Sequence, residues 1–246
     1  MAGRILLVLG LLAVWLIVLL PLKAVAIAAG GADRLGYDDV FGTVWNGRIY
    51  GLVTPGGRVR EAAVSTRPAA LLTGRLALDW QIADNSVSGR GRAALAPGGV
   101  TLDDVSLTVP LDRLVAAGRA GLDPDTPVFV RLAHLQVQDG QCRAAQGSLR
   151  SDALAAAAVQ YGVEAPRLTG DIACRGDDLV LTLSGESADM SVDGEAVLRP
   201  GGYDWHVRVR TGHAGLADAL ALAGFAAREQ DGTWHAEGRS SYGSNG

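Results

Sequence analysis

The sequence predicts a mainly β protein, in which one N-terminal transmembrane helix precedes a curved antiparallel sheet or a sandwich-like domain with a few short helices. Three observations support this fold class. An uncharged apolar run of membrane-spanning length lies near the start, side chains after it alternate with period two, and Pro-Gly turn signals separate the alternating segments. Glycine supplies 33 of the 246 residues and aromatic residues only 5%, which suits short strands and tight turns.

The apolar run extends from Ile5 to Leu22 without a charge. As a helix it is about 27 Å long, close to the ~30 Å hydrocarbon core of a bilayer. One interpretation is an uncleaved signal anchor at residues 1–29, and the other is a signal peptide cleaved after Ala24-Val25-Ala26. The length of the run and the charge of Lys23 favour the anchor. We therefore expect a single-pass inner-membrane protein with a cytoplasmic N-terminus and its bulk in the periplasm.

The two cysteines, Cys142 and Cys174, both follow the membrane run. An even number of cysteines in an oxidising compartment predicts a disulfide, which the chain-entropy model values at roughly 3–4 kcal/mol. Two buried free thiols are the alternative. A metal site is less favoured, because neither thiol has a Cys-x-x-Cys partner or a nearby histidine in the sequence.

The alternating segments each place apolar side chains on one face and polar side chains on the other, as in an antiparallel sheet with one wet face. Their apolar members are Leu72, Leu76, Leu78 and Trp80; Val105, Leu107 and Val109; Ala133, Leu135 and Val137; Trp205, Val207 and Val209; and Trp234, Ala236 and Gly238. Short helices are predicted at Leu111–Ala117, Ser151–Tyr161 and Leu216–Ala223 from their capping and stop signals.

These elements predict a periplasmic β-rich domain at residues 30–238 and a flexible polar tail at residues 239–246. The segment Leu72–Ala77 resembles Leu168–Ala173, and in both cases a strand, a Pro-Gly-Gly turn, another strand and a helix follow. This order predicts two repeated halves, residues 40–120 and 128–238. Chance similarity of glycine-rich strands is the alternative.

No motif for catalysis is present: the sequence has no phosphate-binding loop, no His-Glu-x-x-His and no Gly-x-Ser-x-Gly. We therefore expect no enzyme activity, no cofactor and no metal. With 22 Lys and Arg against 26 Asp and Glu, the net charge is −4. A nucleic-acid-binding domain needs a basic surface that releases counterions, so we expect no nucleic-acid partner.

Candidate interaction residues come from two features. Arginines fall on the polar sides of predicted strands and form either a solvated sheet face or a patch for a protein partner or lipid head groups. They are Arg75, Arg90, Arg92, Arg208 and Arg210. The second feature is Trp45, within Phe41–Arg48, which either seals the edge of the first strand or belongs to a membrane-proximal docking strand.

The motif Gly42-Thr-Val-Trp-Asn-Gly47, soon after a single membrane run, resembles the type II secretion system protein N family. Further segments resemble that family in the same order: Pro68–Leu76, Gln141–Gly147, Leu168–Cys174 and Leu222–Gly238. The resemblance implies a bitopic inner-membrane protein with a periplasmic β-rich domain. It also implies membership of a machine that exports folded proteins from the periplasm, with no catalytic residues.

The predicted function is therefore that of an accessory, non-catalytic interaction subunit in protein transport. Its expected partners are other inner-membrane and periplasmic type II secretion proteins, and membrane lipid through the N-terminal helix. The alternative is a membrane-anchored lipid-binding or lipid-transfer protein, whose apolar sheet face forms an open groove for acyl chains. A closed sandwich core is favoured over that groove, because exposed apolar patches are rare.

Overall fold

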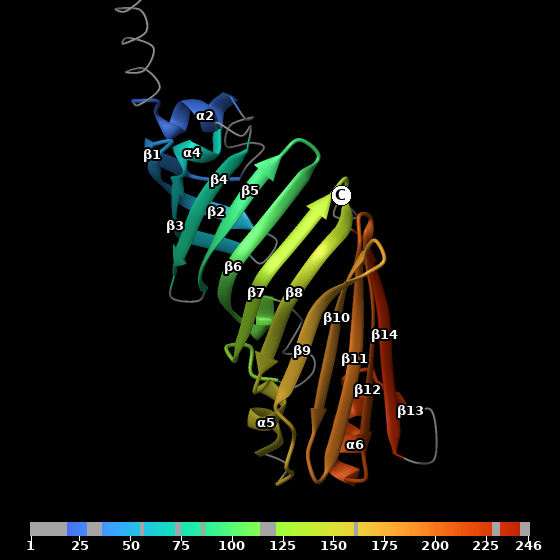
Figure 1. Ribbon diagram of the computed structural model, residues 1–246. Helices are drawn as coiled ribbons and strands as arrows, with labels where there is room; N and C mark the ends of the chain where they lie inside the picture. Colours follow the sequence, from blue (N-terminus) through green and yellow to red (C-terminus); the bar gives the residue numbers. More distant parts are fainter. Residues whose placement is uncertain are drawn as a thin grey trace, which may run out of the picture. The chain divides into compact units, whose positions relative to one another are not determined.

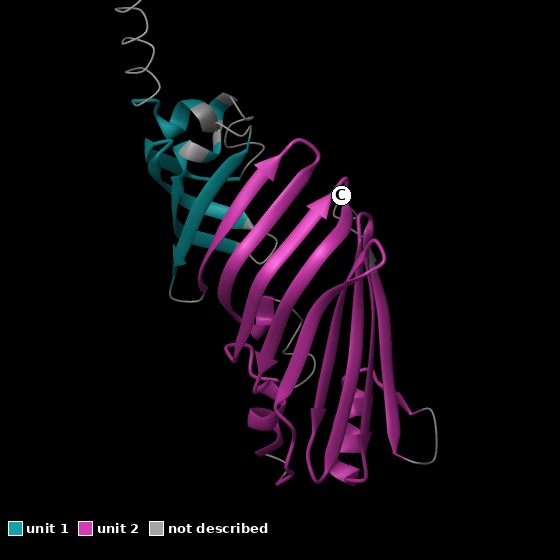
Figure 2. Cartoon of the chain, viewed as in Figure 1, with its two compact units in different colours: residues 1–85 teal, residues 86–246 magenta. Residues whose placement is uncertain are grey.

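The computed structural model describes residues 19–28, 36–54, 57–71, 75–84, 87–113, 122–159, 162–227 and 232–241. The chain divides into two compact units, residues 1–85 and residues 86–246 (Figure 2). Fourteen strands are present in the described residues, and each strand pairs antiparallel with its neighbours inside its unit. Most of the predicted membrane run, residues 5–18, lies outside these ranges. Within them no helix has both the length and the apolar character to cross a membrane.

The first unit contains four strands in chain order, two of them joined by a helix (Figure 1). Its elements are α2 (Leu22–Ala28), β1 (Asp39–Thr43), β2 (Asn46–Thr54), β3 (Gly57–Thr66), α4 (Pro68–Leu71) and β4 (Leu76–Ala83). Val40, Val59 and Ala62 are its buried apolar side chains among the described residues. A mainly β fold is therefore confirmed from the first strand onwards.

The Gly-Thr-Val-Trp-Asn-Gly motif is the hairpin that joins β1 to β2, in which Gly42 pairs with Gly47. Gly42 has φ +91°, and a Cβ there would lie 2.5 Å from the carbonyl oxygen of Asn46. A Cβ at Gly47 would collide with the side chain of Leu22 in α2. The backbone conformation thus requires a glycine at position 42, and a side chain at position 47 would displace the Leu22 side chain of α2.

The second unit is a single sheet of ten strands in the order β5-β6-β7-β8-β9-β10-β11-β12-β14-β13 (Figure 1). The strands are β5 (Ser88–Ala96), β6 (Gly99–Pro110), β7 (Pro127–Gln138), β8 (Gln141–Ser151), β9 (Leu168–Arg175), β10 (Asp178–Glu186), β11 (Met190–Arg199), β12 (Gly202–Thr211), β13 (Ala226–Ala227) and β14 (Thr233–Ser241). The remaining elements are η1 (Leu111–Arg113), α5 (Ala153–Ala158) and α6 (Ala214–Leu222). Since all ten strands belong to one sheet, the sandwich alternative is wrong for this unit.

The core of the second unit lies at the end of the strands that carries α5 and α6, the lower end in Figure 1. One cluster there contains Leu111, Val128 and Ala153, and the other contains Val163, Met190, Val192, Val209 and Leu216. Helices and loops, rather than a second sheet, therefore cover the apolar face at this end.

The opposite half of the same face is less well covered. Its apolar side chains are partly exposed, and Leu95 is 44% exposed. The partly exposed residues there include Val100, Leu102, Leu135, Val137, Leu179 and Leu198. The cross-strand pairs Val100↔Val137 and Leu102↔Leu135 put them on one continuous surface. The sheet thus has a closed apolar end and a partly open one.

The predicted alternation is confirmed in β6, β12 and β14, but not throughout β7. There Ala133 is exposed, because the β7–β8 register shifts between Leu132 and His134. Such a bulge changes which side chains face the core. Leu132 and Leu135 can therefore lie on the same face although they are three residues apart.

The predicted helices are shorter or slightly shifted. The helix predicted at Leu216–Ala223 is α6, which begins two residues earlier, and α5 occupies only the middle of Ser151–Tyr161. Of Leu111–Ala117, the described part is the 3₁₀ turn η1, and residues 114–117 lie outside the described residues. At the other end, β14 continues to Ser241 and so includes the first residues of the expected tail, while residues 242–246 are outside the described range.

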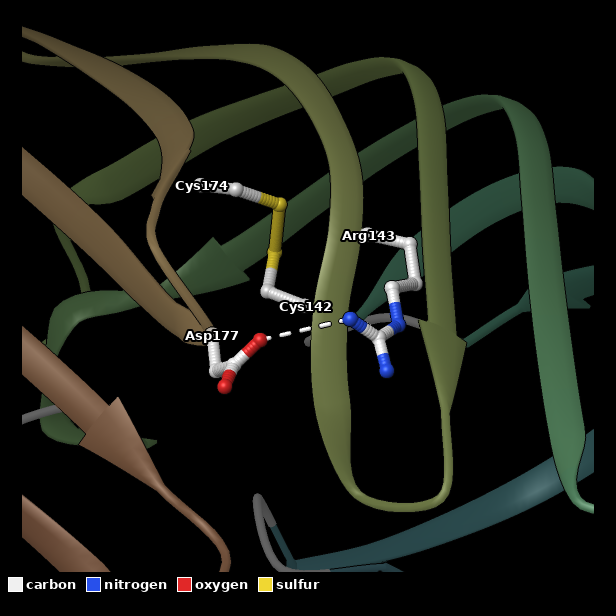
Figure 3. Close-up of a disulfide and its surroundings, with 4 residues drawn as sticks. All are labelled: Cys142, Arg143, Cys174 and Asp177. Carbon is white, nitrogen blue, oxygen red and sulfur yellow. Dashed lines mark hydrogen bonds and ion pairs between the residues drawn. A yellow bond between two sulfur atoms is a disulfide. The ribbon is translucent and has the colours of Figure 1, made fainter.

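The predicted disulfide between Cys142 and Cys174 is confirmed, and it bridges β8 and β9 (Figure 3). The β8–β9 ladder runs from Ser151↔Leu168 to Gln146↔Ala173 and ends there. Beyond that point β8 continues to pair with β7, and β9 continues to pair with β10. The disulfide therefore lies where the hydrogen bonds between two neighbouring strands have stopped.

Two further links cross this seam beside the disulfide, and Figure 3 shows one of them, the ion pair between Arg143 and Asp177. The backbone N–H of Cys142 donates to the carbonyl oxygen of Asp177 at 2.8 Å. The Arg143 side chain forms an ion pair with the Asp177 carboxylate at 3.3 Å. The disulfide thus attaches β9 to β8, and a backbone hydrogen bond and an ion pair attach the β9–β10 turn to β8.

We predict that the double variant Cys142→Ser, Cys174→Ser lowers the free energy of unfolding of the second unit by about 3–4 kcal/mol, because the unfolded chain loses a covalent constraint. Urea unfolding followed by tryptophan fluorescence measures it, since Trp205 and Trp234 both lie in this unit. The reduced wild-type protein is the control and should match the variant. Equal stability of oxidised wild type and variant would contradict the structural role.

Candidate interaction surfaces

The polar face of the ten-stranded sheet carries most of the charged side chains of the second unit. No group of three or more His, Cys, Asp or Glu side chains in the described ranges is arranged to hold a metal ion. This face presents charged and hydrogen-bonding side chains.

On β9 to β14 three arginines of this face, Arg175, Arg199 and Arg239, are held by carboxylates. Arg175 donates to both carboxylate oxygens of Glu195, at 2.9 and 2.6 Å. Arg199 forms ion pairs with Asp178 and Asp204, and Arg239 contacts Asp204. These pairs join side chains of five strands and neutralise the three arginines that take part in them.

The same contacts lower the pKa values of two carboxyl groups. The hydrogen bond from Arg175 is the largest cause for Glu195, and the hydrogen bond from Arg239 is the largest cause for Asp204. Both groups stay ionised over a wider pH range than free carboxyls do. The ion pairs of this region therefore persist into mildly acidic conditions.

The four predicted arginines of the second unit occupy different electrostatic environments. Arg92 lies opposite Asp103 and forms an ion pair with Asp104. Arg208 lies opposite Asp193 on β11, and Arg210 lies opposite Ser191. Arg90 lies opposite Ser106. Cross-strand carboxylates thus offset Arg92 and Arg208, but not Arg90.

The two predicted residues of the first unit lie outside its strands. Arg75 precedes β4, and its backbone N–H donates to the carbonyl oxygen of Ala70 at 3.2 Å. Trp45 is partly buried in the β1–β2 turn, where its carbonyl oxygen accepts the N–H of Thr66 at 3.3 Å. Arg75 and Arg90, predicted to lie near one another, belong to different units.

A shallow depression of about 280 Å³ lies on the polar face over β10, β11 and β12. Its polar lining side chains are Thr182, Ser184, Asp193, Glu195, His206 and Arg208. Acidic, basic and hydroxyl groups are mixed in it, and Arg175 already occupies both oxygens of Glu195. The depression therefore changes the shape of this face but does not gather side chains of one chemical type.

Three exposed residues of β7 and β8 were missed from the sequence: Phe129, Arg131 and Arg150. The alternation of β7 places Phe129 and Arg131 on the polar side. Whether they belong to a charged surface depends on the residues that lie opposite them on β6 and β8. That information comes from the strand register, in which Arg131 lies between Ser106 and Ser148.

The comparison with known families agrees with the order of motifs along the chain. Residues 33–234 match the family model of type II secretion system (T2SS), protein N. The chain belongs to this family. The match covers both units and includes the hairpin motif, the two cysteines and the start of β14. The searches of curated proteins and of solved structures found no match.

Family membership makes this chain an accessory component of type II secretion and implies interaction with other components of that system. The surfaces above are the parts of the described structure on which such contacts can form. Arg175, Arg199 and Arg239 on β9 to β14 are ion-paired, whereas Arg90 forms no ion pair among the described residues.

We predict that Arg175→Gln raises the pKa of Glu195 towards its ordinary value, because the hydrogen bond that favours the carboxylate is lost. A lowered folded-state pKa gives stability that is present above the unfolded-state pKa and lost as pH falls through the folded-state pKa. The variant should thus be less stable than wild type at neutral pH, and the difference should vanish in acid. An NMR titration of the Glu195 carboxyl carbon measures the pKa shift. Arg210→Gln is the matched control, and an equal shift there would refute this assignment.

Proposed function

We propose that this chain is a non-catalytic subunit of the type II secretion system, anchored in the inner membrane by its N-terminal segment. Its periplasmic sheet presents polar surfaces to neighbouring secretion proteins. The observation that carries the proposal is the family match over residues 33–234. The uncharged run Ile5–Leu22 supports the anchor, because its length suits a bilayer.

The second unit supports a scaffolding role through its rigidity. Ten strands share one hydrogen-bonded sheet, and the disulfide joins β8 to β9 where their ladder ends. Ion pairs between side chains of β9, β10, β11, β12 and β14 restrain the polar face further. A surface held in this way can bind a partner with little loss of conformational entropy.

Photocrosslinking in intact cell envelopes tests the scaffolding role. We predict that a photoreactive residue at position 45, 90 or 208 forms adducts with other type II secretion proteins, which mass spectrometry identifies. Position 163 is the matched control, because Val163 is buried in the core of the second unit. Recovery of phospholipid or lipopolysaccharide without protein adducts would overturn the proposal.

A second candidate function is lipid binding on the apolar face of the second unit. The observation that favours it is the partly open half of this face, where Leu95 is 44% exposed. A pocket of about 140 Å³ at this end is lined by Val137, Leu179, Leu198 and Pro200, among others. Hydrocarbon needs no hydrogen bonds from such a surface, so an acyl chain is a chemically suitable occupant.

The lipid candidate predicts that phospholipid stays bound to the detergent-purified protein and that Leu135→Asp reduces it by about tenfold, because a charge replaces an apolar contact. Lipid mass spectrometry measures the bound amount. Gln136→Asp is the matched control, since Gln136 is the adjacent, exposed residue. Equal lipid content in both variants and wild type would exclude this groove.

A further inference from the structure

Three arginines and one phenylalanine form an unneutralised basic surface on the polar side of β5, β7 and β8. They are Arg90, Phe129, Arg131 and Arg150, and we call this set the arginine face. All four side chains are exposed, and Phe129 is 44% exposed. An exposed aromatic side chain among arginines has the composition of a protein interface, where both residue types are enriched.

The strand register shows why this surface keeps its charge. Arg90 lies opposite Ser106, which in turn lies opposite Arg131. Arg131 lies opposite Ser148 on its other side. Phe129 lies opposite Arg150, which lies opposite Thr169 on β9. Arg131 and Arg150 therefore face no carboxylate across either neighbouring strand, and Arg90 faces none across β6.

Within the described part of the chain, Arg90, Arg131 and Arg150 also form no ion pair, although acidic residues outnumber basic ones in the sequence. The contrast with neighbouring arginines is sharp. Arg92, two residues from Arg90, pairs with Asp104, and Arg175 on β9 pairs with Glu195. The excess of positive charge is thus local to the arginine face.

We propose that the arginine face binds an acidic segment of a partner protein. Guanidinium groups donate two parallel hydrogen bonds to a carboxylate, which gives both energy and orientation. The hydroxyl of Ser106 lies between Arg90 and Arg131 in the register, that of Ser148 lies between Arg131 and Asp171, and both can supply further hydrogen bonds. Phe129 provides an apolar contact for a side chain between the acidic residues.

The distribution of charge favours a protein segment over an anionic bilayer. The same sheet face carries Asp171, Asp193 and Glu195 on the neighbouring strands β9 and β11. Arg208 and Arg175 offset Asp193 and Glu195, but a membrane surface would also meet Asp171, which forms no ion pair in the described part of the chain, and this carboxylate would repel it. A narrow peptide responds only to charges within about one Debye length, roughly 8 Å at physiological ionic strength. Over Arg90 and Arg131 such a peptide lies two or more strands away from Asp171, so it can use these arginines with little repulsion.

This inference rests on the proposed role as an interaction subunit and specifies the chemistry of one partner. It makes the contact electrostatic, so that binding should weaken as the salt concentration rises. It also separates the arginine face from Arg208, which faces Asp193.

The test uses the full chain in uncharged detergent and two fluorescein-labelled peptides, one of alternating Glu and Leu and one with Gln in place of Glu. Fluorescence anisotropy measures binding. We expect the Glu peptide to bind at least about tenfold more tightly than the Gln peptide.

The double variant Arg131→Ser, Arg150→Ser should lose about tenfold in affinity for the Glu peptide, and Phe129→Ser about threefold. Arg210→Ser, which removes an exposed arginine opposite Ser191, should stay within about twofold of wild type.

Equal binding of the two peptides would overturn the proposal, as would an equal loss in the Arg210→Ser control. Flotation with vesicles of phosphatidylethanolamine and phosphatidylglycerol tests the other occupant, and their retention through Arg131 and Arg150 without peptide binding would assign the surface to lipid. No other secretion protein is needed in this assay. Its failure would refute the acidic partner alone, whereas failure of crosslinking in the envelope would refute the scaffolding role.

Discussion

The second unit depends on one constraint: a single sheet has two faces, and its apolar face must be covered without a second sheet. Short elements meet this constraint at one end, where Leu216 of α6 and Ala153 of α5 are buried against the strands. Small side chains suit this task, because an alanine-rich helix can approach a sheet closely. The other end keeps partly exposed apolar residues such as Leu95. The buried core therefore lies at the end of the strands that α5 and α6 cover, and the partly exposed apolar residues lie at the other end.

The polar face solves a second problem, since strands rich in charged side chains must pair without repulsion. Carboxylates opposite or beside arginines achieve this on β9 to β14, as Glu195 does for Arg175. On β7 and β8, serine and threonine separate the charges instead, as Ser148 does beside Arg131. Hydroxyl neighbours avoid repulsion but leave the positive charge uncompensated. The two halves of one face therefore differ in electrostatic character although they share the same backbone geometry.

Much of this fold was predictable, because period-two alternation and turn residues report directly on antiparallel strands. The disulfide followed from the count of cysteines and their place after the membrane run. Ala133 was misplaced, since a bulge leaves no clear mark in the sequence. The single sheet and the set around Arg131 required the register, which alternation does not contain. A pattern tells which face a side chain occupies, but only pairing tells which side chains are neighbours.

From β5 to β12 every strand of the second unit pairs with the strand that follows it in the chain. Such pairing joins segments that are close in sequence, so the sheet has a low contact order for an all-β structure. Most of these hairpins close a short loop, so the entropy lost at each such step is small, whereas the β6–β7 and β8–β9 connections are longer and contain η1 and α5. The sheet can therefore grow one strand at a time as the chain emerges, each finished edge serving as the template for the next strand. A subunit of this topology can begin to fold before its last strand is available.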